Sequence, residues 1–134
     1  MKQSPIFTKT YDLLLWLIPR TLDFPKSQRG VLARQVQTQS FAFYEALVDA
    51  GLSDDPEPHL HRADAHLTKL RTYLRLCRDL HLLSVGQYGY ASQQVAQVGK
   101  LLGGWFKSLA EEPQSESKPR RQRNRRQRRA VSAG

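Results

Sequence analysis

The chain has 134 residues, a length typical of one domain with a short extension, which excludes most multidomain enzymes. Lysine and arginine total 21 and aspartate and glutamate total 12, so the formal net charge is +9. Residues 1–110 hold 13 basic and 9 acidic residues, whereas residues 111–134 hold 8 basic and 3 acidic residues. Both segments are therefore predicted to prefer polyanions or acidic partners.

Neither a membrane span nor a secretion signal is evident. The longest aliphatic and aromatic run, Leu13 to Ile18, has six residues, whereas a transmembrane helix needs about 20. The N-terminus has a charge but no apolar stretch that leads to a cleavage site, so we expect a cytoplasmic protein without membrane contact. The single cysteine, Cys77, cannot form an internal disulfide and has no CxxC partner, which argues against metal or redox chemistry.

The first predicted helix carries four apolar side chains on one face, at spacings of 4, 3 and 4: Phe7, Tyr11, Leu14 and Ile18. Pro19 falls inside this pattern. Because proline removes a backbone donor and clashes with the preceding turn, we expect a kink or a restart of the helix there. The pair Phe24-Pro25 is predicted to end the segment.

The second predicted helix runs from about Ser27 to Ala50. Ser27 is a candidate N-cap, since a hydroxyl can accept from an unpaired amide of the first turn. Gly51 is the candidate stop, since glycine readily adopts the left-handed conformation of a helix end. The predicted inner face is Leu32, Val36, Gln39, Phe43 and Ala46. Residues 53–58 contain two prolines and three acids and no apolar side chain, which predicts a loop.

Two further segments have a sustained heptad pattern. The third predicted helix has Leu60, Ala63, Leu67, Leu70, Leu74 and Cys77 on one seam, and the fourth has Tyr88, Ala91, Val95, Val98, Leu102, Trp105 and Leu109. Segments with alternating polarity, typical of strands, are absent from the sequence. The pattern predicts an all-α protein in which residues 1–110 form an up-down-up-down four-helix bundle.

Residues 111–134 form a second, arginine-rich segment without a large apolar residue before Val131. Such a segment cannot offset the entropy cost of ordering by burial, so we expect a disordered tail. It is a candidate nucleic-acid contact, which would bind phosphates without reading bases. The alternative is a tail that only solubilises the protein or docks another protein. Its cations are Lys118, Arg120, Arg121, Arg123, Arg125, Arg126, Arg128 and Arg129.

Three arginines, hereafter the arginine row, are predicted to flank the seam of the third helix: Arg71, Arg75 and Arg78. Arginine binds phosphate or carboxylate through its planar fork, so the row is a candidate surface for a polyanion or an acidic partner. The alternative is a solvated helix face on which Asp64 and Asp79 are partial partners. Four further cations are candidates to extend the row: Lys69, Lys26, Arg29 and Arg34.

The sequence offers no apparatus for catalysis. The cluster His59, His61, Asp64 and His66 lacks the i, i+4 histidine pair of a zinc site, so we expect no metal. Phosphate-binding, serine-hydrolase and zinc-protease motifs are absent from the sequence, as are paired carboxylates on one predicted helix face. We therefore expect no enzymatic activity, no cofactor and no small-molecule substrate.

Two glycines lie one turn apart in the fourth helix, Gly99 and Gly103, and each costs about 1 kcal/mol relative to alanine. We expect them to permit a close helix contact, within the subunit or between subunits. The aromatic residues Trp16, Trp105 and Phe106 are expected to lie in the core more often than to bind a ligand.

Several elements occur in an order that resembles a known family. They are Tyr11, residues 24–29 (FPKSQR), Ala63-Asp64, Leu70-Arg71, residues 74–76 (LRL) and residues 99–108 (GKLLGGWFKS). Over Phe7 to Leu109 the chain resembles the Avd type of four-helix protein. These are the accessory variability determinants of diversity-generating retroelements, related to four-helix proteins encoded in ribosomal RNA intervening sequences.

The resemblance implies a bacterial or phage-encoded homopentamer that forms a positively charged barrel. It implies binding to the reverse transcriptase and to nucleic acid, RNA and possibly DNA, during copying of a template RNA, without catalysis. Arg71 and Arg75 match arginines that the family carries on its third helix. The alternative function is a ribosome- or rRNA-associated interaction protein without a polymerase partner. The acidic loop at Asp54–Pro58 and the arginine tail depart from the family pattern.

Overall fold

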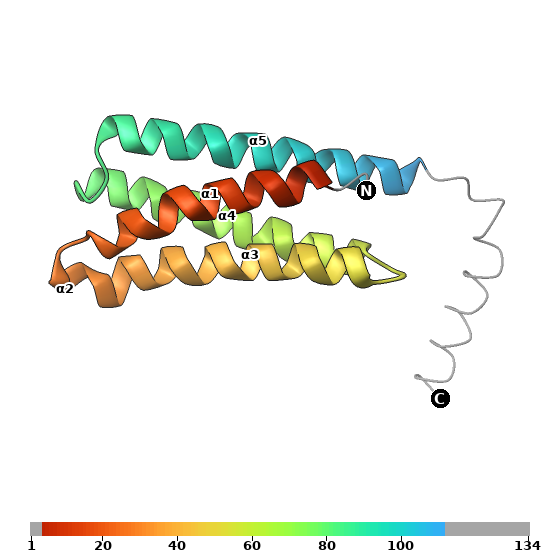
Figure 1. Cartoon of the computed structure of the whole chain (residues 1–134), viewed down its shortest axis with the longest axis horizontal. Helices are drawn as coiled ribbons and strands as arrows, with labels where there is room; N and C mark the ends of the chain where they lie inside the picture. The colour runs from red at the N-terminus through yellow and green to blue at the C-terminus, as the bar shows by residue number, and fades with distance from the viewer. Residues whose placement is uncertain (1–3, 112–134) are drawn as a thin grey trace.

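A computed structural model describes residues 4–111, and these residues form four long helices (Figure 1). The helices are α1 (Ser4–Leu22), α3 (Arg34–Leu52), α4 (Glu57–Asp79) and α5 (Val85–Ala110). A short helix, α2 (Lys26–Gln28), and a π-helical segment, η1 (Arg29–Ala33), connect α1 to α3. Strands are absent from the described part of the chain, so the predicted all-α class is confirmed. The predicted tail lies outside these residues, apart from Glu111.

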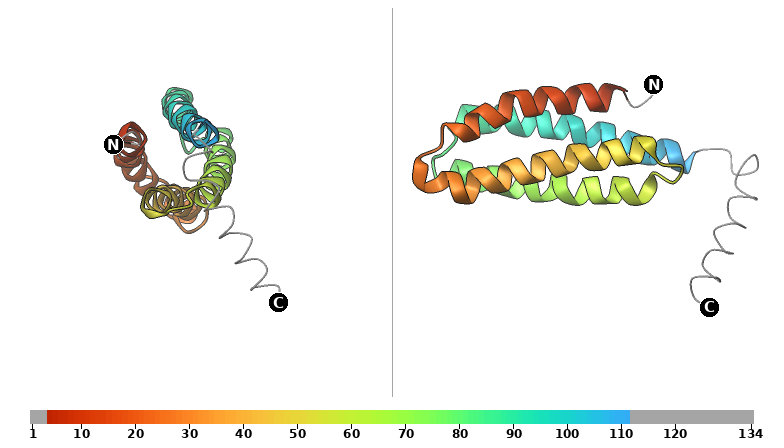
Figure 2. Two further views of the ribbon diagram at one scale, coloured as in Figure 1. Left: turned by 90° about the vertical axis from the view of Figure 1, so that its right-hand side faces the viewer. Right: turned by 60° about the horizontal axis from the view of Figure 1, so that its bottom comes forward.

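The long helices surround a single core of buried side chains, and the end-on view in Figure 2 shows how the four helices are arranged around it. Helix α1 packs against α3 and α5, and α4 packs against the same two helices. Consecutive long helices run in opposite directions and are joined by short connections (Figure 1). The arrangement is the predicted up-down-up-down bundle.

The predicted seams of the last three helices form most of this core. Each predicted inner residue of α3 and α4 is buried, and the α5 seam is buried from Ala91 to Trp105. The predicted inner face of α3 contains one polar residue, Gln39. Its side chain has a hydrogen-bond partner, since its Oε1 lies 2.7 Å from Nδ1 of His66 on α4. A satisfied amide can be buried at little cost, whereas an unpaired one cannot.

The predicted inner face of α1 is wrong by about one residue. The buried positions are Ile6, Thr10, Leu13, Leu17 and Thr21, whereas Tyr11 is 61% exposed. Two of the inner residues are threonines, and this interrupted the apolar period on which the prediction depended. The Thr21 hydroxyl is satisfied: it donates to the Ile18 carbonyl at 2.7 Å and accepts from Nε2 of Gln37 on α3 at 2.8 Å.

Three predicted helix boundaries are also corrected. Helix α1 continues through Pro19 to Leu22 without a restart. The next helical segment begins at Lys26 with Pro25 as its N-cap, so Ser27 is not the cap; proline fits there because it fixes φ and needs no donor. Gly51 is helical rather than left-handed, and α3 ends at Leu52, where Ser53 becomes extended.

The connection between α4 and α5 is fixed by local hydrogen bonds. His81 has a φ of 62°, the one positive φ of a non-glycine residue among those described. Its amide donates to the Arg78 carbonyl and the Leu82 amide donates to the Cys77 carbonyl, which is the pairing of a Schellman motif. Ser84 then caps α5 through a reciprocal capping box with Gln87. The turn therefore positions the first residues of α5 beside the end of α4.

Among the described helices, none combines the length and the apolar character that crossing a bilayer would require.

Replacing Thr10 by valine should raise the free energy of unfolding by about 1 kcal/mol. The Thr10 hydroxyl is fully buried and lacks a hydrogen-bond partner in the described structure, and valine keeps its shape. Thr21→Val is the matched control, since it removes two hydrogen bonds and should lower stability by a similar amount. Urea unfolding followed by circular dichroism measures both. If Thr10→Val instead lowered the free energy of unfolding as much as Thr21→Val, the Thr10 hydroxyl would have a hydrogen-bond partner in solution.

Candidate nucleic-acid and partner interface

The arginine row lies along the groove between α4 and α5. Arg71 lies over the backbone of α5: a Cβ atom on Gly99 would be 2.7 Å from Nη2 of Arg71. About two turns further along α4, the guanidinium of Arg78 is 4.7 Å from the ring centroid of Tyr88. Arg75, exposed, lies between them on the same side of α4. Both outer arginines are thus held against α5 while the charges face solvent.

Within residues 4–111, two members of the row have no acidic partner. Arg78 pairs with Asp79 at 2.8 Å, as the sequence suggested. Asp64, the other candidate partner, takes part in no ion pair among residues 4–111, and neither do Arg71 and Arg75. An exposed ion pair such as Arg78–Asp79 contributes little to stability. The guanidinium groups of Arg71 and Arg75 have no such partner within residues 4–111, so they are available to bind phosphate or carboxylate.

The four cations that were candidates to extend the row lie elsewhere. Lys69 is two residues before Arg71, about 200° around the helix, on the side of α4 that faces α3. There Arg62 pairs with Asp49 of α3 at 3.2 Å. Burial, followed by the charges of Lys69 and Arg62, lowers the pKa of His66 on this same side. The other three, Lys26, Arg29 and Arg34, lie in α2, η1 and the start of α3.

The charges are distributed unevenly along the bundle. One end, hereafter the cationic end, contains the α4–α5 turn and α2, and the other, the acidic end, contains the α3–α4 loop and the end of α5 (Figure 1). Toward the cationic end lie Arg20, Lys26, Arg29, Arg34, Arg71, Arg75 and Arg78, with the acids Asp23 and Asp79. Toward the acidic end lie Glu45, Asp49, Asp54, Asp55, Glu57, Asp64 and Glu111, with the cations Lys9, Arg62, Lys100 and Lys107.

The chain leaves the bundle at the acidic end. Helix α5 finishes at Ala110, on the opposite side of the molecule from the α4–α5 turn (Figure 1). The eight tail cations, Lys118 to Arg129, lie outside the described residues. The attachment point of the tail is therefore 11 residues of α5 beyond Gly99, which Arg71 contacts, and 22 residues beyond Tyr88, which lies under Arg78.

The predicted role of the two glycines is only partly correct. Gly99 faces a neighbour, but the neighbour is the Arg71 guanidinium rather than a helix backbone. Gly103 is exposed, and a Cβ there would meet nothing within 4 Å, so Gly103 makes no close contact with the rest of the described bundle. The absence of a side chain at Gly99 lets the Arg71 guanidinium approach α5 closely. A contact of Gly103 with another subunit stays a prediction.

Alanine at either glycine should raise the free energy of unfolding by about 0.5–1 kcal/mol, because glycine is a poor helix former. Only Gly99→Ala should also change RNA affinity, since its methyl group displaces the Arg71 guanidinium. Thermal unfolding and RNA titrations of Gly99→Ala and Gly103→Ala measure the two effects separately. A loss of RNA affinity in Gly103→Ala alone would instead place the binding surface further along α5.

The outer face of α1 is apolar. Tyr11 and Leu15 are each 61% exposed and Leu22 is 59% exposed, and the half-buried Ile18 lies between them. The spacing of the four residues is 4, 3 and 4, a second heptad seam with no partner in the described part of the chain. Sequence reasoning missed this seam because it assigned Tyr11 and Ile18 to the core. We call Tyr11, Leu15, Ile18 and Leu22 the outer seam.

The histidines of α4 point in different directions. His61 stacks on Phe106 of α5 at a centroid distance of 4.9 Å, whereas His66 bonds Gln39 of α3. Groups of three or more potential metal ligands are absent from residues 4–111. Burial raises the pKa of the Cys77 thiol to about 11, so this side chain is protonated and unreactive at neutral pH.

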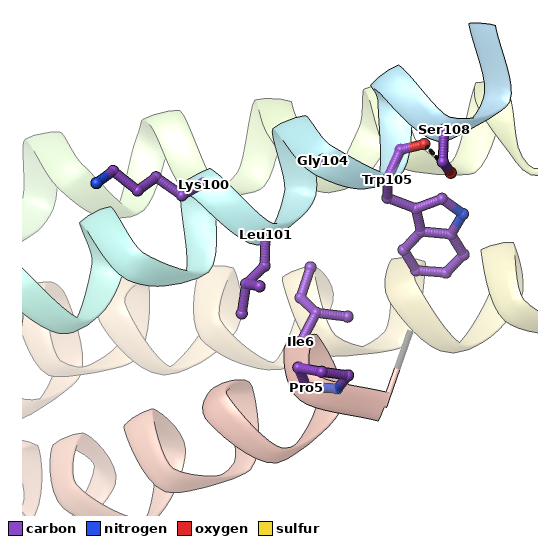
Figure 3. Close-up of a pocket in the computed structure, with 7 residues that line it drawn as sticks. All are labelled: Pro5, Ile6, Lys100, Leu101, Gly104, Trp105 and Ser108. Carbon is purple, nitrogen blue, oxygen red and sulfur yellow. Dashed lines mark hydrogen bonds between the residues drawn. The ribbon is translucent and has the colours of Figure 1, made fainter. Parts of the chain in front are cut away.

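A groove of about 230 Å³ lies between the first turn of α1 and the last turns of α5. Pro5, Ile6, Leu101 and Trp105 form its apolar wall, and the Lys100 side chain extends away from them (Figure 3). Trp105 is a core residue, as expected, in an edge-on contact with Phe7 at 6.1 Å. Lys100 and Ser108 are its polar lining residues, and the Ser108 hydroxyl donates to the Trp105 carbonyl at 2.9 Å.

The fold and its surfaces define a small four-helix bundle with an arginine row, of which Arg71 and Arg75 take part in no ion pair among residues 4–111, and an exposed apolar seam. A family model described as bAvd-like matches residues 5–109. The chain therefore belongs to the bAvd-like family, which confirms the resemblance drawn from the sequence. A comparison with curated proteins gives no match.

Proposed function

We propose that this protein is a non-catalytic accessory protein of a diversity-generating retroelement, which binds the reverse transcriptase and the template RNA in the cytoplasm. Membership of the bAvd-like family supports the class of function. The single observation that carries the binding role is that Arg71, held against Gly99 of α5, and Arg75, one turn further along α4, take part in no ion pair among residues 4–111.

The cationic end is the proposed RNA-facing part of the bundle. Phosphate contacts depend on unpaired lysine and arginine side chains and are screened by salt. At physiological ionic strength a polyanion is affected mainly by charges within about 8 Å. The acidic end therefore interferes little with binding at the cationic end, and the tail supplies further cations from its own attachment point.

The outer seam is the proposed contact between copies of the chain. The four large apolar side chains of the outer seam have the heptad spacing by which one helix packs against another. Exposed apolar surface of this kind is costly in a monomer and marks an interaction site. The number five comes from the family resemblance, and the seam itself supports only self-association.

The test is the solution mass, measured by light scattering coupled to size exclusion, of the full chain and of a chain ending at Leu109, each with and without a structured RNA. A mass near five subunits for both, with RNA binding weakened but retained after truncation, is the expected result. A monomer or dimer whose RNA binding disappears with the tail would reject the scaffold function. Failure to bind a cognate reverse transcriptase, with RNA binding intact, would favour an rRNA-associated protein.

A further inference from the structure

Three side chains form a stacked cluster between α1 and α5, outside the arginine row and the outer seam. Nη1 of Arg20 donates to the Trp16 carbonyl at 2.9 Å, and the guanidinium carbon lies 4.6 Å from the centroid of the Trp16 ring. The Trp16 ring in turn lies 4.8 Å from the Tyr90 ring, with a tilt of 44°. We call Arg20, Trp16 and Tyr90 the Trp16 cluster.

The cluster is accessible and its arginine is not neutralised. Trp16 is half-buried rather than part of the core, and Tyr90 is 44% exposed. Arg20 takes part in no ion pair among residues 4–111 and makes one of the five hydrogen bonds that a guanidinium can donate. The backbone bond and the tryptophan ring hold the guanidinium in place, so little entropy is lost when it binds an anion.

We propose that the Trp16 cluster binds an unpaired nucleotide of the nucleic acid, an inference that rests on the proposed function. The base stacks on the exposed part of the Tyr90 and Trp16 rings, and Arg20 binds the neighbouring phosphate. Aromatic rings beside an unpaired cation are the arrangement by which proteins hold single strands without reading sequence. A duplex cannot use the site, because its bases are already stacked on one another.

The surroundings favour this cluster over a similar pair nearby. Tyr88, two residues before Tyr90, lies on the opposite side of α5 under Arg78, but Asp79 neutralises that arginine at 2.8 Å. The Trp16 cluster lies toward the cationic end. Acidic residues lie on both sides of the cluster along the helix: Asp12 is one turn before Trp16, and Asp23 follows the end of α1. Their negative charges disfavour phosphate beyond the Trp16 cluster.

The test uses tryptophan fluorescence of the full chain, which contains two tryptophans. Trp105 is only 6% exposed, so quenching by a stacked base reports on Trp16. A 12-nucleotide oligo-uridine should quench the emission and saturate together with its binding measured by anisotropy. A duplex RNA of the same length should bind without quenching. Trp16→Phe should remove the quenching while oligo-uridine still binds.

Variants test the contacts one at a time. Tyr90→Ala should weaken single-strand binding by about tenfold, and Tyr90→Phe should keep it. Tyr44→Ala is the matched control, a tyrosine of similar exposure, 37%, on α3. Arg20→Gln should lower the logarithmic salt slope by about 0.7, the value for one phosphate of a single strand.

The outcomes distinguish this site from the proposed function. Absence of quenching, or equal single-strand affinity of Tyr90→Ala, Tyr90→Phe and wild type, with duplex and single-strand binding retained, would overturn the Trp16 site and leave the accessory function standing. Loss of reverse-transcriptase binding in Tyr90→Ala, with oligo-uridine binding unchanged, would assign the cluster to a protein partner and also overturn it. A wild-type chain that binds no nucleic acid would reject the proposed function itself.

Discussion

Replacing Arg71 and Arg75 together by glutamine should lower RNA affinity about tenfold to thirtyfold at moderate salt. Two exposed charge-assisted contacts of about 1 kcal/mol each account for this range. The logarithmic salt slope should fall by about 1.5, because two phosphates are no longer neutralised. Stability should change little, since neither side chain takes part in an ion pair or hydrogen bond in residues 4–111. Anisotropy titrations over a series of salt concentrations measure both quantities.

The same helix offers a control with the same change in charge. Arg62→Gln with Lys69→Gln removes two cations from the side of α4 that faces α3, and the Arg62–Asp49 pair lost there is exposed and weak. If both double variants bind RNA equally poorly, affinity follows net charge, and the arginine row has no special role. A loss confined to the Arg71 and Arg75 variant supports a surface on the α4–α5 groove.

Introducing a charge at Leu15 should convert the proposed assembly into monomers. A glutamate in the outer seam would be desolvated without a partner if the seam packed against another copy, and such burial costs several kcal/mol. The single chain should fold normally, because Leu15 is 61% exposed within it. Light scattering of Leu15→Glu measures the mass, and circular dichroism verifies the helices.

Gln93→Glu provides the comparison, since it adds the same charge at an exposed position of α5 away from the seam. It should leave the mass unchanged. An unchanged mass in Leu15→Glu as well would show that the outer seam does not join subunits, and a monomeric wild type would show that no assembly forms.

The heptad seams of α4 and α5 and the inner face of α3 were predictable because large apolar residues dominate them at regular spacing. Helix α1 was not predictable in the same way. Its inner face contains Thr10 and Thr21, and its outer face contains Tyr11 and Leu15, so hydrophobicity alone assigns the wrong side. The partner that satisfies Thr21 is Gln37, which only the packing of α1 against α3 reveals.

The candidate site was predictable only where one helix determines it. The spacing of Arg71, Arg75 and Arg78 places them on one side of α4, and the same geometry already places Lys69 on the other side. The contact of Arg71 with Gly99 depends on the register between α4 and α5. The Trp16 cluster likewise depends on how α1 and α5 align, and periodicity within a single helix does not contain that information.

Because charge is separated along the bundle, the net charge of the protein does not describe the electrostatic force near either end. α5 has 26 residues, about 39 Å at 1.5 Å per residue, several times the screening distance in physiological salt. Surfaces that meet opposite ends of the bundle therefore experience forces of opposite sign. The described bundle should be retained at low salt by both anion- and cation-exchange matrices. Two such bundles should also associate end to end, and this association should weaken as the ionic strength rises.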